Sequence, residues 1–200
     1  MVKFFEGSAS IPFTWDHVAQ AFWRRYPNPH STHVLTEDTF FQELQGHKLY
    51  SKRLFIKTNK LPKWGEAFVS SRTVCIVEES IVDPKLKSLI TYTRNIGFNR
   101  AMTVEEKTVY TADPQHQQWT LAKRQAWISS SLFGFKFAIE AFGLERYKKN
   151  ATKATLGFMH VLKENFGGGK ARGDVQQADD AHKKLKDAAL KWATSGKVSL

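Results

Sequence analysis

Cysteine is almost absent from this sequence, because Cys75 is the only one in 200 residues. A single thiol excludes an internal disulfide and a metal site built from several thiolates. Cys75 lies in the apolar run Val74-Cys75-Ile76-Val77, which predicts a buried strand. We therefore interpret its thiol as an inert part of the core.

Long hydrophobic runs are also lacking, and no stretch of roughly 18 apolar residues is present to span a membrane. The N-terminal segment Met1-Val2-Lys3-Phe4-Phe5-Glu6 reaches an acidic residue before a signal-peptide core could form. It also lacks the arginine-rich, acid-poor character of a transit peptide. We expect neither a secretory route nor a cleaved leader, so that another mechanism would retain the protein in any organelle.

Catalytic signatures are missing too: there is no glycine-rich phosphate loop, no His-Glu-x-x-His and no Gly-x-Ser-x-Gly. The adjacent pairs Glu78-Glu79 and Glu105-Glu106 fall in predicted strands, where neighbouring side chains point to opposite faces. Each pair is interpreted as one solvated and one paired glutamate. His30 and His33 have no cysteine or acid at metal-ligand spacing, so we expect no metal or cofactor, and either packing or ligand contact for these histidines. The sequence favours a protein that is not an enzyme.

Acidic residues are scarce relative to basic ones: 19 Asp and Glu against 30 Lys and Arg give a net charge of +11. Such a surface attracts phosphate of some kind. Nucleic acid is disfavoured as the partner, because the aromatic residues have core spacing and no recognition helix, stacking sheet or zinc motif accompanies them.

The order of predicted elements indicates an α+β fold. Thr14 is a candidate N-cap for a helix reaching Tyr26, where the Tyr26-Pro27-Asn28-Pro29 corner ends it. Strands are predicted at 1–12, 33–45, 48–58, 72–82, 88–98, 101–112 and 119–130, and one long helix from Leu132 to Phe166. We expect a helix-grip fold, in which a curved antiparallel sheet of six to seven strands wraps the long C-terminal helix and encloses a cavity for a hydrophobic ligand.

Glycines at 167–169 are predicted to end the folded domain at residue 166. Residues 167–200 form a Gly-rich linker and a charged tail with helical periodicity over 174–194. Its seven basic and four acidic residues leave +3 in the tail and +8 in the domain. An interfacial membrane helix and a solvated or disordered extension are both compatible with this pattern.

Several short motifs occur together in a fixed order: Arg25-Tyr26-Pro27-Asn28-Pro29, His33-Val34-Leu35-Thr36-Glu37-Asp38, Arg53-Leu54, Lys57-x-x-Lys60-Leu61-Pro62-x-Trp64, Val82-Asp83-Pro84 and Ser129-Ser130-Ser131-Leu132-Phe133-Gly134. With them, the chain from residue 1 to about 166 resembles the PRELI-domain family of mitochondrial lipid-transfer proteins. It is most similar to the branch that carries phosphatidic acid, rather than the sister branch that carries phosphatidylserine.

The resemblance implies a START-like helix-grip domain that transfers phosphatidic acid between the outer and inner mitochondrial membranes and so supports cardiolipin synthesis. It also implies a heterodimer with a small helical-hairpin protein carrying two Cys-x9-Cys motifs, residence in the intermembrane space and transient contact with anionic membranes. Phosphatidylserine transfer and a helix-grip enzyme acting on a small hydrophobic substrate are the alternatives. The implied headgroup residues are Arg25, His33, Lys57, Lys60, Asn150, Lys153, Arg53 and Arg146, and the implied lid loop contains Leu61, Pro62, Trp64 and Phe68.

Overall fold

A computed structural model describes residues 2–58, 71–99 and 101–167, which form an antiparallel sheet and a long helix. The helices are α1 (Trp15–Ala21), the 3-10 helix η1 (Phe22–Arg24) and α2 (Lys136–Phe166). The strands are β1 (Lys3–Ile11), β2 (Val34–Gln45), β3 (Lys48–Thr58), β4 (Thr73–Asp83), β5 (Ser88–Asn95), β6 (Thr103–Ala112) and β7 (Thr120–Ser129).

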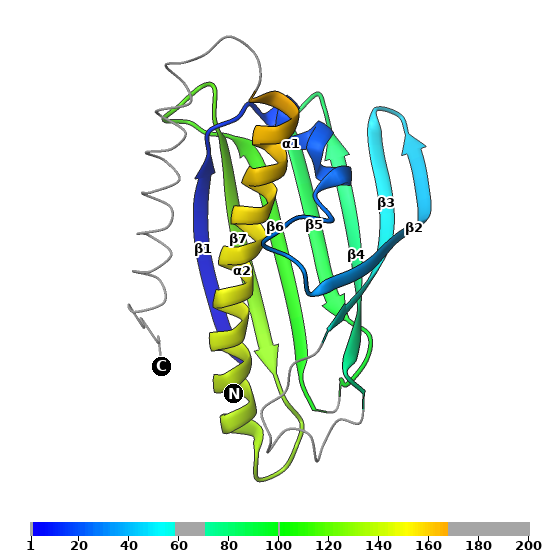
Figure 1. Ribbon diagram of the computed structural model, residues 1–200, viewed down its shortest axis with the longest axis vertical. Coiled ribbons are helices and arrows are strands. Elements are labelled where there is room, and N and C mark those ends of the chain that lie inside the picture. Colours follow the sequence, from blue (N-terminus) through cyan, green and yellow to red (C-terminus); the bar gives the residue numbers. More distant parts are fainter. Residues whose placement is uncertain (1, 59–70, 100, 168–200) are drawn as a thin grey trace.

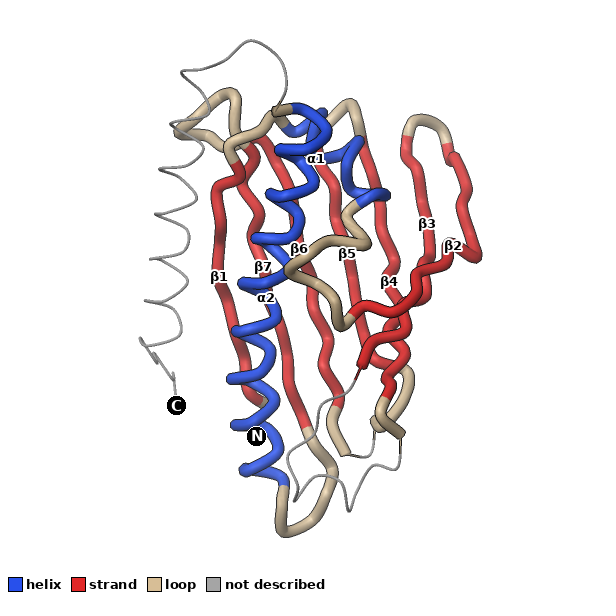
Figure 2. The backbone as a smooth tube through the Cα atoms, in the orientation of Figure 1, coloured by secondary structure: helices blue, strands red, loops and turns tan. Residues whose placement is uncertain are grey.

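The seven strands form one sheet in the order β1-β7-β6-β5-β4-β3-β2. Strands β2 to β7 pair with their neighbours in the chain, and β1 closes against β7 with Lys3 opposite Ile128. The connection from β1 to β2 carries α1 and η1 across the sheet, on the face that α2 also covers (Figures 1 and 2). This confirms the predicted helix-grip architecture and its seven-strand option.

Helix α2 has 31 residues, so it extends about 46 Å and runs along most of the sheet. It packs chiefly on β1, β7 and α1. Its buried side chains recur at helical spacing, as an amphipathic helix requires, and include Ile139, Tyr147, Ala151, Phe158 and Leu162. Among the described residues, no helix is both long enough and apolar enough to cross a bilayer.

The buried apolar residues form two clusters at different heights along α2. One cluster joins α1 to the far end of α2 and includes Ile11, Phe22 and Leu162, while the other packs Ala126 and Ile128 of β7 around Tyr147. Members of both clusters also line the candidate site, among them Phe158 of the first and Tyr147 of the second.

The element boundaries differ from the predicted ones at two helix ends. Thr14 caps α1 as predicted, and its hydroxyl accepts a hydrogen bond from the His17 amide at 3.4 Å. The chain continues from α1 as the 3-10 helix η1, so the helical segment ends at Arg24 and not at Tyr26. Helix α2 begins at Lys136 rather than Leu132, because Gly134 adopts a φ of 78° that a right-handed helix cannot contain.

The predicted environment of Cys75 is wrong. Cys75 lies in β4 as expected but is only half-buried. Its neighbours Val74 and Ile76 line the cavity described below, and successive residues of a strand alternate between faces. Cys75 therefore belongs to the opposite face of the sheet from α2 and is not part of the core.

Helix α2 ends at Phe166 with Gly167 as its cap, in agreement with the predicted end of that element. The linker and tail predicted beyond it lie in residues 168–200, outside the described part of the chain. The division into a domain over 1–166 and a tail therefore stays a prediction.

Candidate functional site

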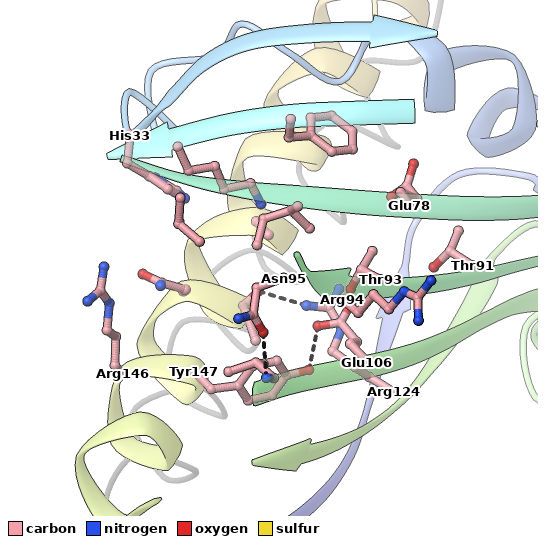
Figure 3. A pocket seen from close by; sticks show the side chains of 18 of the residues that line it. His33, Glu78, Thr91, Thr93, Arg94, Asn95, Glu106, Arg124, Arg146 and Tyr147 are labelled. Atoms are coloured by element: carbon pink, nitrogen blue, oxygen red, sulfur yellow. Dashed lines mark hydrogen bonds between the residues drawn. The ribbon is translucent and has the colours of Figure 1, made fainter. Parts of the chain in front are cut away.

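A cavity of about 260 Å³ lies between α2 and the sheet. Strands β3 to β7 and the middle of α2 supply most of its wall (Figure 3). Its apolar lining includes the buried residues Ile11, Tyr110, Ala122 and Phe158. This part of the lining suits hydrocarbon.

Charged side chains also line the cavity, and cations outnumber acids. Among the described residues, four basic side chains face two acidic ones, Glu78 and Glu106. The excess of two positive charges favours an anionic group in the same space, since a charge held away from bulk water needs a partner. The four cations are Arg25, Lys57, Arg124 and Arg146, whereas Arg94 is exposed and lies opposite the exposed Glu105 on the other face of the sheet.

His33 lies where the α1–β2 connection meets the cavity, with Arg146 of α2 near it (Figure 3). Its backbone oxygen accepts a hydrogen bond from the Thr58 amide at 2.8 Å, which fixes the connection to the end of β3. Burial, followed by the positive charges of Lys57, Lys153 and Arg146, lowers the pKa of His33 to about 4. The imidazole is therefore neutral at pH 7 and offers one donor and one acceptor beside three cations.

Arg25 is held at a second part of the wall, where η1 meets the sheet. Its guanidinium pairs with Glu78 of β4, donates to the Phe22 carbonyl at 3.4 Å and lies 4.1 Å from the centre of the Phe22 ring. Burial alone would lower the pKa of Arg25, but the Glu78 carboxylate outweighs it and the pKa is raised. Arg25 thus stays cationic inside the wall.

Arg53 completes this network from β3, on the far side of Glu78. It pairs with Glu37 of β2, lies 3.7 Å from the other Glu78 oxygen and donates to the Phe22 carbonyl at 3.4 Å. Only 2% of its side chain is exposed. Arg53 of β3 therefore links β2, β4 and η1 next to the Arg25 side chain.

These features can be compared with known proteins. A family match to the PRELI-like family extends over residues 16–168, which is most of the chain. The chain belongs to the PRELI-like family.

Its relatives bear names consistent with that assignment. "PRELI domain-containing protein 1, mitochondrial" of Gallus gallus is 49% identical over 86% of this chain and 82% of its own length. The human protein of the same name is 43% identical over 94% and 87%. "Protein UPS1, mitochondrial" of Saccharomyces cerevisiae is 32% identical over 82% and 95%.

Solved structures show that the PRELI-like chain shares its fold with more distant proteins. The Zhui aromatase/cyclase from Streptomyces sp. R1128 matches with a TM-score of 0.57, over 84% of this chain and 99% of its own. TTHA0849 from Thermus thermophilus matches with a TM-score of 0.52 over 82% and 99%. Both are only 10% identical, so they bear on the helix-grip fold alone.

Five of the eight predicted headgroup residues of this PRELI-like chain line the cavity. Lys153 is exposed and lies close enough to His33 to lower its pKa without lining the wall, whereas Arg53 supports the wall from the sheet. Lys60 and the lid residues Leu61, Pro62, Trp64 and Phe68 lie outside the described residues. The five lining residues are Arg25, His33, Lys57, Asn150 and Arg146.

A third polar group in the cavity was not predicted. The Tyr147 hydroxyl donates to Glu106 at 2.5 Å (Figure 3), Thr108 donates to the other Glu106 oxygen at 2.9 Å, and the Arg124 guanidinium donates to the Ala151 carbonyl at 3.4 Å. Burial raises the pKa of Glu106, but Arg124 and these hydrogen bonds outweigh it, and the pKa is lowered.

The sequence did carry a weak signal for this group. Strand alternation predicts one paired glutamate in Glu105-Glu106, and the structure has Glu106 facing the cavity and Glu105 exposed. The partners of Glu106 come from β7 and α2. The register of β7 against β6 and the position of α2 are set only in the folded protein. In the part of the chain that the structure describes, no three His, Cys, Asp or Glu side chains group as a metal site.

Proposed function

We propose that this protein is a non-enzymatic carrier of phosphatidic acid between membranes. The observation that carries the proposal is the combination of an apolar lining with four cations against two acids in one cavity. Acyl chains occupy the apolar part, and the phosphate pairs with the positive excess near His33. Lys57, Arg146 and Asn150 supply donors to it, and Lys153 adds positive charge from outside the wall.

The charge balance favours a phosphomonoester over the phosphatidylserine headgroup. A phosphomonoester approaches two negative charges near neutral pH and accepts several charge-assisted hydrogen bonds. The phosphatidylserine headgroup combines a phosphodiester and a carboxylate with an ammonium group, which lowers its net negative charge to about one and brings a positive charge toward Lys57 and Arg146, already close enough to His33 to lower its pKa. Phosphatidic acid is therefore the preferred cargo and phosphatidylserine the runner-up.

The cellular setting is part of the same proposal. Relatives at 43–49% identity are named mitochondrial, which supports residence in the mitochondrion, and the intermembrane space is the compartment that we propose within it. There the protein moves phosphatidic acid from the outer to the inner membrane for cardiolipin synthesis, as a heterodimer with a small protein bearing two Cys-x9-Cys motifs.

The decisive experiment compares lipid transfer by the wild type and two charge-reversal variants. Lys57→Glu puts an acid beside His33 in the cavity, whereas Lys123→Glu makes the same change at an exposed position of β7, next to the cavity-facing Arg124. We expect Lys57→Glu to slow phosphatidic acid transfer between liposomes by at least about tenfold, because a charge-assisted contact becomes a repulsion. Lys123→Glu should transfer normally.

Native mass spectrometry of the purified protein identifies the cargo independently. Phosphatidic acid should co-purify and should transfer faster than phosphatidylserine. Preferred transfer of phosphatidylserine would replace the cargo assignment, and chemical turnover of a bound lipid would contradict a carrier. Unchanged transfer by Lys57→Glu would remove the headgroup site.

A further inference from the structure

Large exposed apolar side chains gather at one end of the molecule. This end holds the start of β1, the β5–β6 turn and the β7–α2 turn, which the strand register brings to the same end of the sheet. Thirteen large apolar side chains are highly exposed among the residues that the structure describes, and seven of them belong to this end: Val2, Phe4, Ile96, Trp127, Phe133, Phe135 and Phe137. We call the β7–α2 turn with its three phenylalanines, Phe133, Phe135 and Phe137, the phenylalanine tip.

The phenylalanine tip is a fixed turn. Gly134 takes a φ of 78° at its centre, and the Phe135 amide donates to the Leu132 carbonyl at 3.3 Å. The buried Glu140 of α2 accepts a hydrogen bond from the Ser130 amide at 3.3 Å. Phe133 is nevertheless fully exposed and Phe137 is 72% exposed. The hydrogen-bonded backbone of the turn therefore directs these two rings into solvent.

The first turn of α2 does not contain the residue types that usually stabilise the start of a helix. No side chain caps it at Phe135, no acidic residue lies in the turn, and Lys136 adds a positive charge to the positive end of the helix dipole. Lys3 and Arg94 lie at the same end of the sheet, across from Ile128 and Glu105 respectively. Rings beside cations match the interface of a bilayer that contains anionic lipid.

The tip is also continuous with the cavity. Phe98 and Met102 of the β5–β6 connection line the cavity, as do Ile139 and Phe142 in the first two turns of α2. A membrane in contact with the phenylalanine tip therefore lies against the part of the cavity that these four residues line.

We propose that the phenylalanine tip is the membrane-docking wedge of this protein, with Phe133 and Phe137 inserting at the headgroup–acyl boundary of an anionic bilayer. The inference rests on the proposed function, since it supplies the site at which a carrier meets its membranes. Other clusters of exposed apolar residues, such as Phe40 and Leu44 of β2, carry acidic neighbours, Glu43 among them, and do not suit an anionic surface.

The test uses the full-length chain and a matched control. The tip variant is Phe133→Ser with Phe137→Ser, and the control is Phe40→Ser with Leu44→Ser, whose side chains are 57% and 68% exposed at the opposite edge of the sheet. Flotation with phosphatidylcholine vesicles containing phosphatidylglycerol should show at least about a tenfold weaker partitioning for the tip variant. The control should float like the wild type.

A second measurement reads insertion directly. In a Cys75→Ser background, an environment-sensitive fluorophore at Phe133→Cys should brighten and shift to the blue when anionic vesicles are added, while the same fluorophore at Phe40→Cys should not. Native mass spectrometry with short-chain phosphatidic acid should show equal binding by the tip variant and the wild type. If the wild type binds no phosphatidic acid, the carrier proposal is wrong, whereas the flotation and fluorescence results still decide whether the phenylalanine tip docks on membranes.

Three results would overturn the wedge. Equal flotation of the tip variant and the wild type would show that the rings do not insert. An equal loss in the β2 control would place docking elsewhere. A wild-type dimer that the tip variant converts to monomer would assign the rings to a second copy of the chain.

Discussion

His33 is the residue whose chemistry reports most directly on the cavity. Its folded-state pKa of about 4 lies below the ordinary 6.5 because of burial and the cations Lys57, Lys153 and Arg146. Between about pH 4 and 6.5 the His33 side chain binds a proton in the unfolded chain but not in the folded protein. His33 therefore contributes fully to folding stability above about pH 6.5, and this contribution is lost as the pH falls toward 4.

We therefore expect His33→Gln to flatten the pH dependence of unfolding between about pH 6.5 and 4, measured by urea denaturation. The wild-type protein, measured under the same conditions, serves as the reference for the slope. Short-chain phosphatidic acid should raise the pKa of His33 in an NMR titration, because the phosphate offsets the neighbouring cations. A pKa that does not move on binding would separate His33 from the headgroup.

Tyr147 makes a second prediction at this scale, on stability. Tyr147→Phe removes the hydroxyl that donates to the Glu106 carboxylate at 2.5 Å, and hydrogen bonds to charged groups contribute about 1.5–3 kcal/mol. We expect the free energy of unfolding to fall by about that amount and the pKa of Glu106 to rise. Tyr92→Phe, at a 43% exposed position of β5, should change the unfolding free energy by less than about 0.5 kcal/mol.

Among the elements, α2 positions the site through its small residues as well as its polar ones. Gly157 lets the helix approach Asn28, whose side chain would collide with any β-carbon at 157. Asn28 in turn donates to the Arg25 carbonyl at 2.7 Å and accepts from the His30 amide at 3.0 Å. One glycine on α2 therefore allows the corner that holds Arg25 and His33.

Gly157→Ala should push Asn28 away and disturb that corner. We expect a loss of about 1–3 kcal/mol in unfolding free energy and weaker phosphatidic acid binding by native mass spectrometry. Gly97→Ala places a β-carbon in open space at a residue without a positive φ, so it should retain both properties. Normal binding by Gly157→Ala would show that the corner is not held by this close approach.

At the scale of the whole molecule, truncation tests the predicted division into a domain over 1–166 and a tail over 167–200. The described lining residues of the cavity run from Ile11 to Phe158, and the predicted tail contributes +3 of the total charge of +11. Truncation after Phe166 should leave lipid affinity unchanged and should lower only the rate of association with anionic vesicles, an effect that salt weakens. A truncated chain that binds no lipid would show that residues 167–200 form part of the domain.

The sequence by itself determined the element order, a sheet of six to seven strands and the long closing helix, because strand alternation, turn residues and helical spacing are local properties of the chain. It also singled out Arg25, His33, Lys57, Asn150 and Arg146, which line the cavity, through a resemblance that depends on motif order. Alternation alone predicted that the two glutamates of each adjacent pair point to opposite faces, although the exposed Glu79 also pairs with Lys52 at 3.0 Å.

Only the tertiary structure decided which charges meet. Arg25, Glu78 and Arg53 are separated by 25 to 53 positions and pair through the register of β3 with β4 and the placement of η1. Glu106, Tyr147 and Arg124 likewise come from β6, α2 and β7, and Cys75 is assigned to the outer face by its neighbours on the cavity side. Register and packing between distant segments minimise the energy of the whole fold, so no local pattern contains them.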